Sequence, residues 1–261
     1  MSDTELIIPF APNRQILSPA TIACFSPQCK AAEIIIERHQ ALTMFLPDDI
    51  EPNRMAQFMM ALISEVNALD HNKVRLDSVW HAAKNLAPTG LIPGKSRGFA
   101  YLIPYKGVCT PVIGYPGYIE LARGCGFLAS LHTDVRCKDE PFEMWTDEDG
   151  AHFTHTPNPD REEVRANIIG AYACWKDAWG NSGFRYVPES GLMKSYRDTP
   201  AWRENFAAMA QKTAILRGSS TWTITDSTRM RAALNLDKHY EQTEHSSLTP
   251  DVMEIIRAAG S

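Results

Sequence analysis

The chain has 261 residues, of which 44% are hydrophobic and 22% are charged, and its formal net charge is −5 at pH 7. This composition supplies a packed core and excludes disordered, collagen-like and disulfide-stabilised proteins. No apolar run reaches the ~18 residues of a membrane span, and the N-terminus has no signal-peptide pattern, so we expect a cytoplasmic protein without a membrane partner. The six cysteines form no C-x-x-C pair, which gives no signal for a zinc or redox site.

Charge is distributed unevenly along the chain. Residues 94–138 hold six basic and two acidic residues, and residues 185–231 hold eight basic and four acidic ones. Residues 139–163 hold one basic and nine acidic residues. Because a polyanion responds to the local field, the two basic segments can form a nucleic-acid groove on a chain that is acidic overall.

The first third of the chain is predicted to be helical. Residues 1–29 are rich in proline and predict an extended N-terminal arm outside the core. Apolar residues then recur at spacings of three and four, which is the period of an amphipathic helix. This pattern predicts helices at residues 30–46, 52–66 and 77–88.

After Gly94 the pattern changes to short alternating segments, which are typical of strands. We predict strands at residues 99–103, 111–115, 127–138, 142–146, 151–156, 166–175 and 184–187, with a helix at 117–125. Asp149-Gly150 is a hairpin turn signal. Helices return at residues 194–197, 199–219 and 227–236.

These elements predict an α+β fold. It comprises N-terminal helices, a central antiparallel sheet with a short helix, and C-terminal helices that pack on the sheet. The core domain is expected to span residues 30–237. Residues 238–261 become polar and predict a flexible tail with a short helix.

The segment 199–219 is predicted to be a single helix with recognisable ends. Thr199 suits the N-cap, Pro200 suits the first helical position, and Gly218 suits a left-handed stop. Its apolar stripe, which we expect to be buried, consists of Trp202, Phe206, Met209, Thr213 and Leu216. The cations that border this stripe are Arg203, Lys212 and Arg217. The predicted helix therefore buries an aromatic seam and presents cations along its edges.

A glycine-rich loop from Gly90 to Ser96 resembles a phosphate-binding P-loop that lacks one residue. A P-loop leads from a strand into a helix, whereas here a predicted helix precedes the loop and a strand follows it. We therefore do not expect a nucleotide site. Lys95 and Arg97 remain as cations on this loop, which suits contacts with a sugar-phosphate backbone.

Two groups of residues invite a metal-site interpretation. His152 and His155 lie three residues apart on a predicted strand, so they point to opposite faces and cannot chelate one ion. A metal-dependent nuclease would need carboxylates beside a lysine such as Lys138. The candidate carboxylates are Asp139, Glu140, Glu143 and residues 147–149. The same residues also fit a solvated acidic hairpin, and both alternatives stay open.

Aromatic and basic residues alternate through the two basic segments. The series comprises Tyr101, Tyr105, Lys106, Tyr115, Tyr118, Arg123, Trp202, Lys212 and Arg217. Proteins that bind single strands combine cations, which contact phosphates, with flat side chains on which bases stack. Each of these aromatic residues, taken alone, also fits the core.

Several separated motifs resemble the RecT family of phage single-strand annealing proteins. They are Ala100–Tyr105, Gly114–Arg123 with Gly126, Phe142 with Glu143, Gly150, His155, Gly170–Tyr172, and Trp202, Phe206, Met209, Lys212, Thr213 and Arg217. The motifs occur in the family's order over residues 40–236. The resemblance implies a core of strands and helices similar to the Rad52-like annealing core.

What the resemblance implies is a non-enzymatic, ATP-independent protein of phage homologous recombination, encoded by a phage or prophage. Such proteins coat single-stranded DNA as homo-oligomeric rings or helical filaments, pair it with a complementary strand, and work beside a phage exonuclease. No cofactor is required, and Mg²⁺ is a candidate modulator of annealing. The alternatives are a metal-dependent nuclease and a passive single-stranded DNA binding module.

The DNA-binding candidates combine positions that match the family with the basic loops. They are Lys95, Arg97, Tyr105, Lys106, Tyr115, Arg123, Arg203, Lys212 and Arg217, with no catalytic residue and no metal ligand. Trp202 is expected to hold its helix in place. The chain departs from the family pattern at Tyr115-Pro116-Gly117, where relatives usually have Tyr-Lys-Gly, and this removes a cation from the turn. The acidic hairpin is expected to meet a basic segment of the next subunit.

Overall fold

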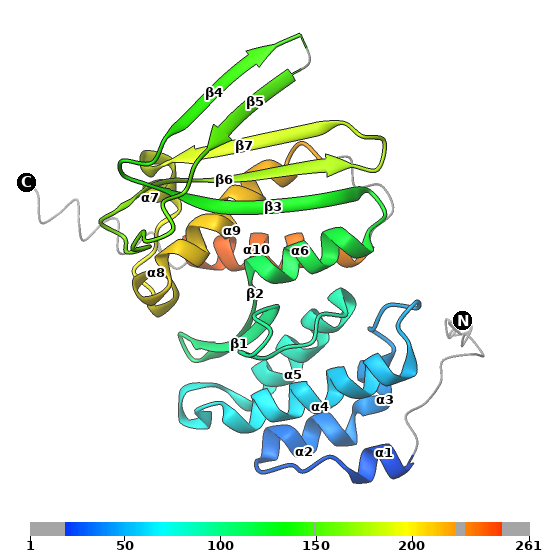
Figure 1. Cartoon of the computed structure of the whole chain (residues 1–261). Coiled ribbons are helices and arrows are strands. Elements are labelled where there is room, and N and C mark those ends of the chain that lie inside the picture. Colours follow the sequence, from blue (N-terminus) through cyan, green and yellow to red (C-terminus); the bar gives the residue numbers. More distant parts are fainter. Residues whose placement is uncertain (1–18, 149, 223–227, 247–261) are drawn as a thin grey trace, which may run out of the picture.

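The computed structural model describes residues 19–148, 150–222 and 228–246. Most of the predicted N-terminal arm and the predicted helix of the tail lie outside these residues. Figure 1 shows a body of helices from the N-terminal part and an antiparallel sheet with helices packed on one face. A small hairpin, β1 (Ala100–Tyr105) with β2 (Val108–Ile113), lies between them. The predicted α+β fold is confirmed.

The helical body is built from amphipathic segments. Its elements are α1 (Pro19–Ala23), α2 (Lys30–Glu37), α3 (His39–Thr43), α4 (Pro52–Ala68), α5 (Leu76–Leu86) and the 3₁₀ turns η1 (His71–Lys73) and η2 (Ala87–Thr89). Helix α4 has Pro52 in its first turn, where a missing N–H costs nothing, and it buries an apolar stripe that includes Phe58 and Leu62. The helix predicted over 30–46 is interrupted, because Arg38 adopts φ −100° and ψ 16° between α2 and α3.

The β1–β2 hairpin is closed by a two-residue turn. Lys106 and Gly107 both have positive φ, at 46° and 81°, which matches the twist of the flanking strands. Gly107 adopts this conformation without strain, whereas Lys106 is a non-glycine residue in the left-handed region. The turn therefore holds a lysine at the exposed tip of the hairpin.

The predicted strands pair antiparallel, but they form separate ladders. Strands β3 (Leu128–Cys137), β6 (Ile168–Asp177) and β7 (Ser182–Pro188) form a three-stranded sheet in the order β3-β6-β7. Strands β4 (Phe142–Asp147) and β5 (Gly150–His155) pair only with each other among the described residues, and we call this hairpin the arm. The base of the arm packs on one face of the sheet through aromatic rings, with Phe153 stacked on Phe184 at 4.2 Å.

Helices cover the opposite face of the sheet. They are α6 (Tyr115–Gly124), α7 (Glu189–Ser195), α8 (Pro200–Glu204), α9 (Phe206–Ser219) and α10 (Thr228–Ser246). Helix α9 lies directly against β3, β6 and β7, α6 also packs on β3, α7 packs on β6 and β7, and α10 packs on α6 (Figure 1). The molecule is therefore layered, with the arm, the sheet and the helices stacked in that order.

The segment predicted as one helix over 199–219 is in fact two helices. Asn205, with φ −132° and ψ 49°, leaves the helical region and separates α8 from α9. Thr199 occupies the N-cap, but its hydroxyl makes no capping hydrogen bond. Gly218 is not a stop and lies inside α9, where a Cβ would come within 2.9 Å of the Trp175 ring. The glycine is thus required by close packing rather than by a left-handed turn.

Helix α9 is buried over more of its surface than a single stripe. Among its polar residues, Gln211, Lys212 and Thr213 are buried together with its apolar ones. The sheet covers one side, and α6 and α10 cover others, so the helix has little solvent-facing surface before Arg217. The prediction that Lys212 lies on an exposed edge of the helix is therefore wrong.

Helix α10 joins the two parts of the molecule. It packs on η2, α5, β2 and α6, and Arg229 Nε donates to the Thr89 carbonyl oxygen at 3.1 Å. The helix runs to Ser246, so the region predicted to be tail begins as a continuation of α10. Among the described residues, no helix combines the length and the apolar character needed to cross a membrane.

Candidate nucleic-acid interface

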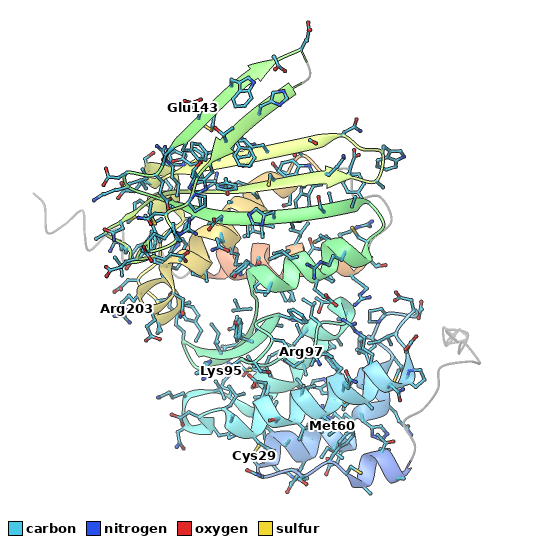
Figure 2. The ribbon with its side chains drawn as sticks, in the orientation of Figure 1. Cys29, Met60, Lys95, Arg97, Glu143 and Arg203 are labelled. Carbon is cyan, nitrogen blue, oxygen red and sulfur yellow. The ribbon has the colours of Figure 1, made fainter. Side chains whose placement is uncertain are left out.

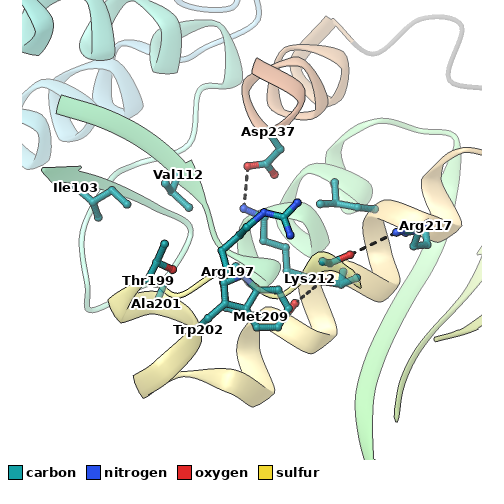
Figure 3. Close-up of a pocket in the computed structure, with 13 residues that line it drawn as sticks. Ile103, Val112, Arg197, Thr199, Ala201, Trp202, Met209, Lys212, Arg217 and Asp237 are labelled. Atoms are coloured by element: carbon teal, nitrogen blue, oxygen red, sulfur yellow. Dashed lines mark hydrogen bonds and ion pairs between the residues drawn. The ribbon is translucent and has the colours of Figure 1, made fainter. Parts of the chain in front are cut away.

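A pocket opens between the β1–β2 hairpin and the segment that runs from the end of α7 into α9 (Figure 3). Ile103 and Val112 form an apolar wall on the hairpin side. Arg197, Trp202 and Arg217 lie among the residues of the facing wall, and Asp237 reaches the pocket from α10. The pocket therefore combines an apolar surface with guanidinium groups, which is the chemistry that a nucleic-acid strand requires.

The arginines of the pocket are fixed by local contacts. Arg197 donates from Nη1 to the carbonyl oxygens of Tyr196, at 2.8 Å, and of Lys194, at 3.1 Å. Arg217 is exposed in the last turn of α9, and its Nη2 lies 3.4 Å from Ser195 Oγ. These contacts orient the two guanidinium groups, and a guanidinium group is a planar donor that can bind phosphate oxygens.

Lys212 occupies a different environment from Arg217. Its Nζ forms an ion pair with Asp237 Oδ1 at 2.8 Å, and the two side chains are only 7% and 6% exposed. Tyr118 donates its hydroxyl to the other carboxylate oxygen, Asp237 Oδ2, and thereby links α6, α9 and α10. The charge of Lys212 is thus neutralised inside the protein, and this geometry does not support the predicted phosphate contact.

Trp202 packs in a cluster of aromatic rings beside α8. The Trp202 ring lies 5.5 Å from the Tyr196 ring and 5.5 Å from the Phe206 ring, and its side chain is buried. The Arg165 guanidinium covers Tyr196 at 4.8 Å. Trp202 therefore holds α8 against α9, as expected, and does not offer its face for base stacking.

Three of the other predicted DNA contacts lie at the borders of the pocket rather than in it. Tyr105 and Lys106 form the tip of the hairpin whose strands line the pocket, and the Lys106 Nζ lies 5.2 Å from the centre of the Tyr105 ring. Arg203 is exposed on α8, where its Nε is 3.6 Å from an Asp198 carboxylate oxygen. The structure thus brings these three residues to the borders of the pocket.

Four further candidates are placed outside the pocket lining. Lys95 and Arg97 are exposed on the loop before β1, on the helical body, whereas Arg203 belongs to the other part of the molecule (Figure 2). Tyr115 is half-buried at the start of α6, and Arg123 is exposed in the last turn of the same helix. A strand that touched all of these residues would have to extend well beyond the pocket.

The glycines of the Gly114-Tyr-Pro-Gly117 motif have a packing role. A Cβ at Gly114 would lie 2.1 Å from the Gly98 carbonyl oxygen, and one at Gly117 would lie 2.2 Å from the Phe99 carbonyl oxygen. The Gly114 N–H also donates to the Phe99 oxygen at 3.0 Å. The motif therefore seats the start of α6 on the backbone that leads into β1, which sets the position of the hairpin.

Sequence reasoning missed two residues of the site. Arg197 lies in the second basic segment, but no periodic pattern distinguishes it from its neighbours. Asp237 lies on the buried face of α10 with Met230 and Ala233. An acidic residue in register with an apolar stripe is a signal that it needs a buried partner, and this signal could have identified Asp237.

The acidic segment is not uniformly solvated. Glu140 is buried, and it accepts hydrogen bonds from the Cys137 N–H at 2.6 Å and the Asn158 N–H at 3.0 Å. His155 Nε2 and Arg161 Nη1 also lie within 3.0 Å and 3.4 Å of its oxygens. Desolvation alone would raise the pKa of Glu140, but these hydrogen bonds and the Arg161 charge outweigh it and lower the pKa.

The two histidines of the arm have different surroundings. His155 is buried against Glu140, whereas His152 stacks on Trp145 at 5.3 Å and contacts Asp147 at 2.7 Å. Within the described part of the chain, no group of three or more histidine, cysteine or acidic side chains could hold a metal ion. The loop from Gly90 to Ser96 likewise connects η2 to β1 and does not lead from a strand into a helix.

Comparison with known proteins shows the family to which the chain belongs. The sequence model of the RecT family matches residues 53–248. The chain is 31% identical over 194 residues to the protein RecT of Escherichia coli (strain K12), covering 68% of this chain and 69% of that protein. It is 24% identical over 217 residues to the uncharacterised protein YqaK of Bacillus subtilis (strain 168), covering 80% of this chain and 73% of that protein. The chain therefore belongs to the RecT family.

Proposed function

We propose that this protein anneals complementary strands of DNA without ATP, as a mediator of phage homologous recombination. The observation that carries the proposal is the pocket between the β1–β2 hairpin and α9, in which fixed guanidinium groups face an apolar wall. Membership of the RecT family supports the same function. Single-stranded DNA is the expected ligand, and the annealed duplex is the expected product.

Arginine phosphate contacts would position the strand without reading its sequence. Arg197 and Arg217 supply planar donors that suit phosphate oxygens, and Ile103 and Val112 offer apolar contact to sugars and bases. Base pairing then provides the driving force, so the protein needs only to neutralise the backbone and keep the base edges accessible. This mechanism requires no catalytic group, and no cofactor is proposed beyond a modulating role of Mg²⁺.

The residues around the pocket would extend the contact along a strand. We propose that Tyr105, Lys106 and Arg203 contact DNA at the borders of the pocket. Lys95, Arg97, Tyr115 and Arg123 would contact more distant parts of a strand, including one shared between neighbouring copies. In a homo-oligomeric ring or filament, repeated pockets would form a continuous track. A phage exonuclease that produces the single strand remains the proposed functional partner.

The test is stopped-flow annealing of two complementary labelled oligonucleotides without nucleotide. We expect the native protein to accelerate annealing, and Arg197→Ala and Arg217→Ala to reduce both binding and rate. Each substitution should lower the salt dependence of binding by about 0.7 in log–log slope, as expected for one lost phosphate contact on a single strand. Lys30→Ala, which changes an exposed lysine on α2 far from the pocket, is the matched control.

Three results would count against the proposal. Binding without faster annealing would leave a passive coating protein. Loss of labelled strand in the presence of Mg²⁺ would favour the metal-dependent nuclease alternative. Unchanged salt slopes in both arginine variants would show that DNA does not bind in this pocket.

A further inference from the structure

A row of aromatic and basic side chains lies on the surface of the helical body. The Arg38 guanidinium, at the break between α2 and α3, lies 5.4 Å from the centre of the Trp80 ring. One turn further along α5, Lys84 Nζ lies 5.7 Å from the centre of the Phe45 ring. Trp80 and Lys84 are four residues apart on one helix and therefore share a face. The two contacts form one continuous surface, which we call the α5 row.

The α5 row ends in apolar side chains that the described residues leave exposed. Met44 is 57% exposed and Phe45 is 42% exposed, and the two follow α3 directly in the chain. Single exposed apolar residues are common on protein surfaces. A group of them bordered by polar side chains is typical of a surface that binds another protein segment.

The two cations of the row have no carboxylate partner among the described residues. The ion pairs of the helical body involve other basic residues, namely Lys30, Arg54, Lys73 and Arg75. Arg38 is exposed, and Lys84 is half-buried with its ammonium against the Phe45 ring. An incoming carboxylate can therefore pair with each cation without displacing an existing partner. The α5 row thus fits a ligand that joins negative charge to apolar surface.

The surroundings of the row favour a short peptide over nucleic acid. Glu37 directly precedes Arg38, and Asp48 and Asp49 follow Phe45 within four residues. All three acidic residues are exposed. Their field repels an extended polyanion such as DNA, whereas a peptide with two carboxylates needs to approach only the two cations.

The N-terminal segment of this chain has the matching chemistry. Residues 3–10, which lie outside the described residues, read Asp-Thr-Glu-Leu-Ile-Ile-Pro-Phe. Two carboxylates are thus followed directly by an apolar run. Figure 1 shows α1, which begins at Pro19, and α3 at the same end of the helical body. The eight residues between Phe10 and Pro19 span up to about 26 Å when extended, about the length of a 17-residue helix such as α4.

We propose that residues 3–10 bind the α5 row of the same molecule. The two carboxylates pair with the cations of the row, and the apolar run covers Met44 and Phe45. Contact within one molecule is favoured, because a short flexible tether gives an effective concentration of about 1 mM. The proposal involves no DNA, so its test does not depend on the proposed annealing function.

Methionine oxidation in the DNA-free protein measures the coverage of the row. Met44 and Met60 are 57% and 53% exposed, so without a further contact both should oxidise to the sulfoxide at similar rates. At an effective concentration of about 1 mM, an intrinsic dissociation constant of about 0.3 mM fills the row for about three-quarters of the time. Met44 should then react about 4-fold more slowly than Met60. Mass spectrometry after treatment with dilute hydrogen peroxide follows each methionine separately.

Full-length variants identify the segment that covers Met44. Phe10→Asp places a charge in the apolar run and should raise the Met44 rate to that of Met60. Asn13→Asp adds the same charge outside residues 3–10, so this matched control should leave Met44 slow. Lys84→Glu should also raise the Met44 rate, and adding Glu5→Lys should lower it again because both charges are then reversed. A constant rate at Met60 shows that the helical body stays folded in each variant.

A zero-length cross-link tests the charge contact and its location in one molecule. A carbodiimide joins a carboxylate to an ammonium that touches it, and we expect Lys84 to be joined to Asp3 or Glu5. In a mixture of isotope-labelled and unlabelled protein, each cross-linked pair should carry a single label. Pairs that combine labelled with unlabelled peptide would show exchange between copies and contradict the proposal.

Two results of the oxidation would overturn the inference. Equal rates at Met44 and Met60 in the native protein would show that nothing covers the row, as would a slow Met44 in both Phe10→Asp and Lys84→Glu show that another segment does. Protection of Met44 that appears only after single-stranded DNA is added would assign the row to nucleic acid instead.

Discussion

Two clusters of buried charge lie on opposite sides of the sheet, and they are built differently. On the helical side, Lys212 has Asp237 as its ion-pair partner among the described residues, and that partner comes from α10. On the arm side, Arg161 contacts three carboxylates, those of Asp134, Glu163 and Glu140. The first cluster joins distant segments through a single pair, whereas the second closes a local loop through several.

This difference shows that the formal charge of a residue does not reveal its role. Lys212 and Arg217 lie five residues apart on α9. Lys212 is buried in an ion pair with Asp237, whereas Arg217 is exposed beside the pocket. A single buried pair has no substitute when one member is lost. In a cluster of several charges, Arg161 keeps two carboxylate partners when the third is lost. The two sides should therefore respond differently to the loss of one carboxylate.

The largest effect is expected from breaking the single pair. Asp237→Ala leaves the Lys212 ammonium buried without its partner, which should lower the free energy of unfolding by about 3–5 kcal/mol. Chemical denaturation followed by circular dichroism measures this change. The double variant Lys212→Met with Asp237→Leu should recover much of the loss, because it removes both charges. A loss below about 1 kcal/mol in the single variant would show that the ammonium reaches water.

A smaller effect is expected on the arm side. Glu140→Gln keeps the shape of the side chain but removes its charge, while Arg161 keeps Asp134 at 2.5 Å and Glu163 at 2.8 Å. We expect a loss of about 1–3 kcal/mol, within the range for hydrogen bonds to a charged group. The pocket beside α9 should be unaffected, since Glu140 lies on the arm side of the sheet. A loss equal to that of Asp237→Ala would remove the distinction between the two clusters.

The pH dependence of the free energy of unfolding also distinguishes the Glu140 cluster from the Lys212–Asp237 pair. The folded protein holds the pKa of Glu140 below its ordinary value, so this group stabilises the fold fully above the pKa of the unfolded chain. That contribution is lost as the pH falls through the lowered pKa of the folded state. Glu140→Gln should flatten this part of the stability curve, whereas the double variant Lys212→Met with Asp237→Leu should not.

The local parts of this architecture could be predicted from the sequence. Helix α4 was located by Pro52 and its apolar spacing, and the arm was located by its turn and alternating residues, because these signals act within a few residues. The break at Asn205 was missed, because no glycine or proline marks it. The Lys212 environment was also missed, since it depends on how α10 docks 25 residues further along the chain.

The two cations of α9 should contribute differently to DNA binding. We expect the loss of binding free energy to be about 1 kcal/mol larger for Arg217→Ala than for Lys212→Met. Arg217→Ala should weaken binding of single-stranded DNA several-fold and uniformly across sequences, because a phosphate contact carries no sequence information. Lys212→Met should leave the salt slope unchanged once the folded fraction is taken into account, since its charge is already neutralised by Asp237. Fluorescence anisotropy at a series of salt concentrations measures both. A lower slope for Lys212→Met would show that DNA displaces Asp237 and takes the lysine.

The smallest expected difference is between two tyrosine hydroxyls, one in each cluster. Tyr118 donates to the ionised Asp237 carboxylate, whereas the Tyr172 hydroxyl lies 3.1 Å from His155 Nδ1. Tyr118→Phe should cost about 1.5–3 kcal/mol because its hydrogen bond is to a charged group, and Tyr172→Phe should cost about 0.5–1.5 kcal/mol. Both substitutions keep the ring and its packing, so denaturation midpoints at neutral pH isolate the hydroxyl. Equal losses would show that the charge of the Asp237 carboxylate adds nothing to its hydrogen bond with Tyr118.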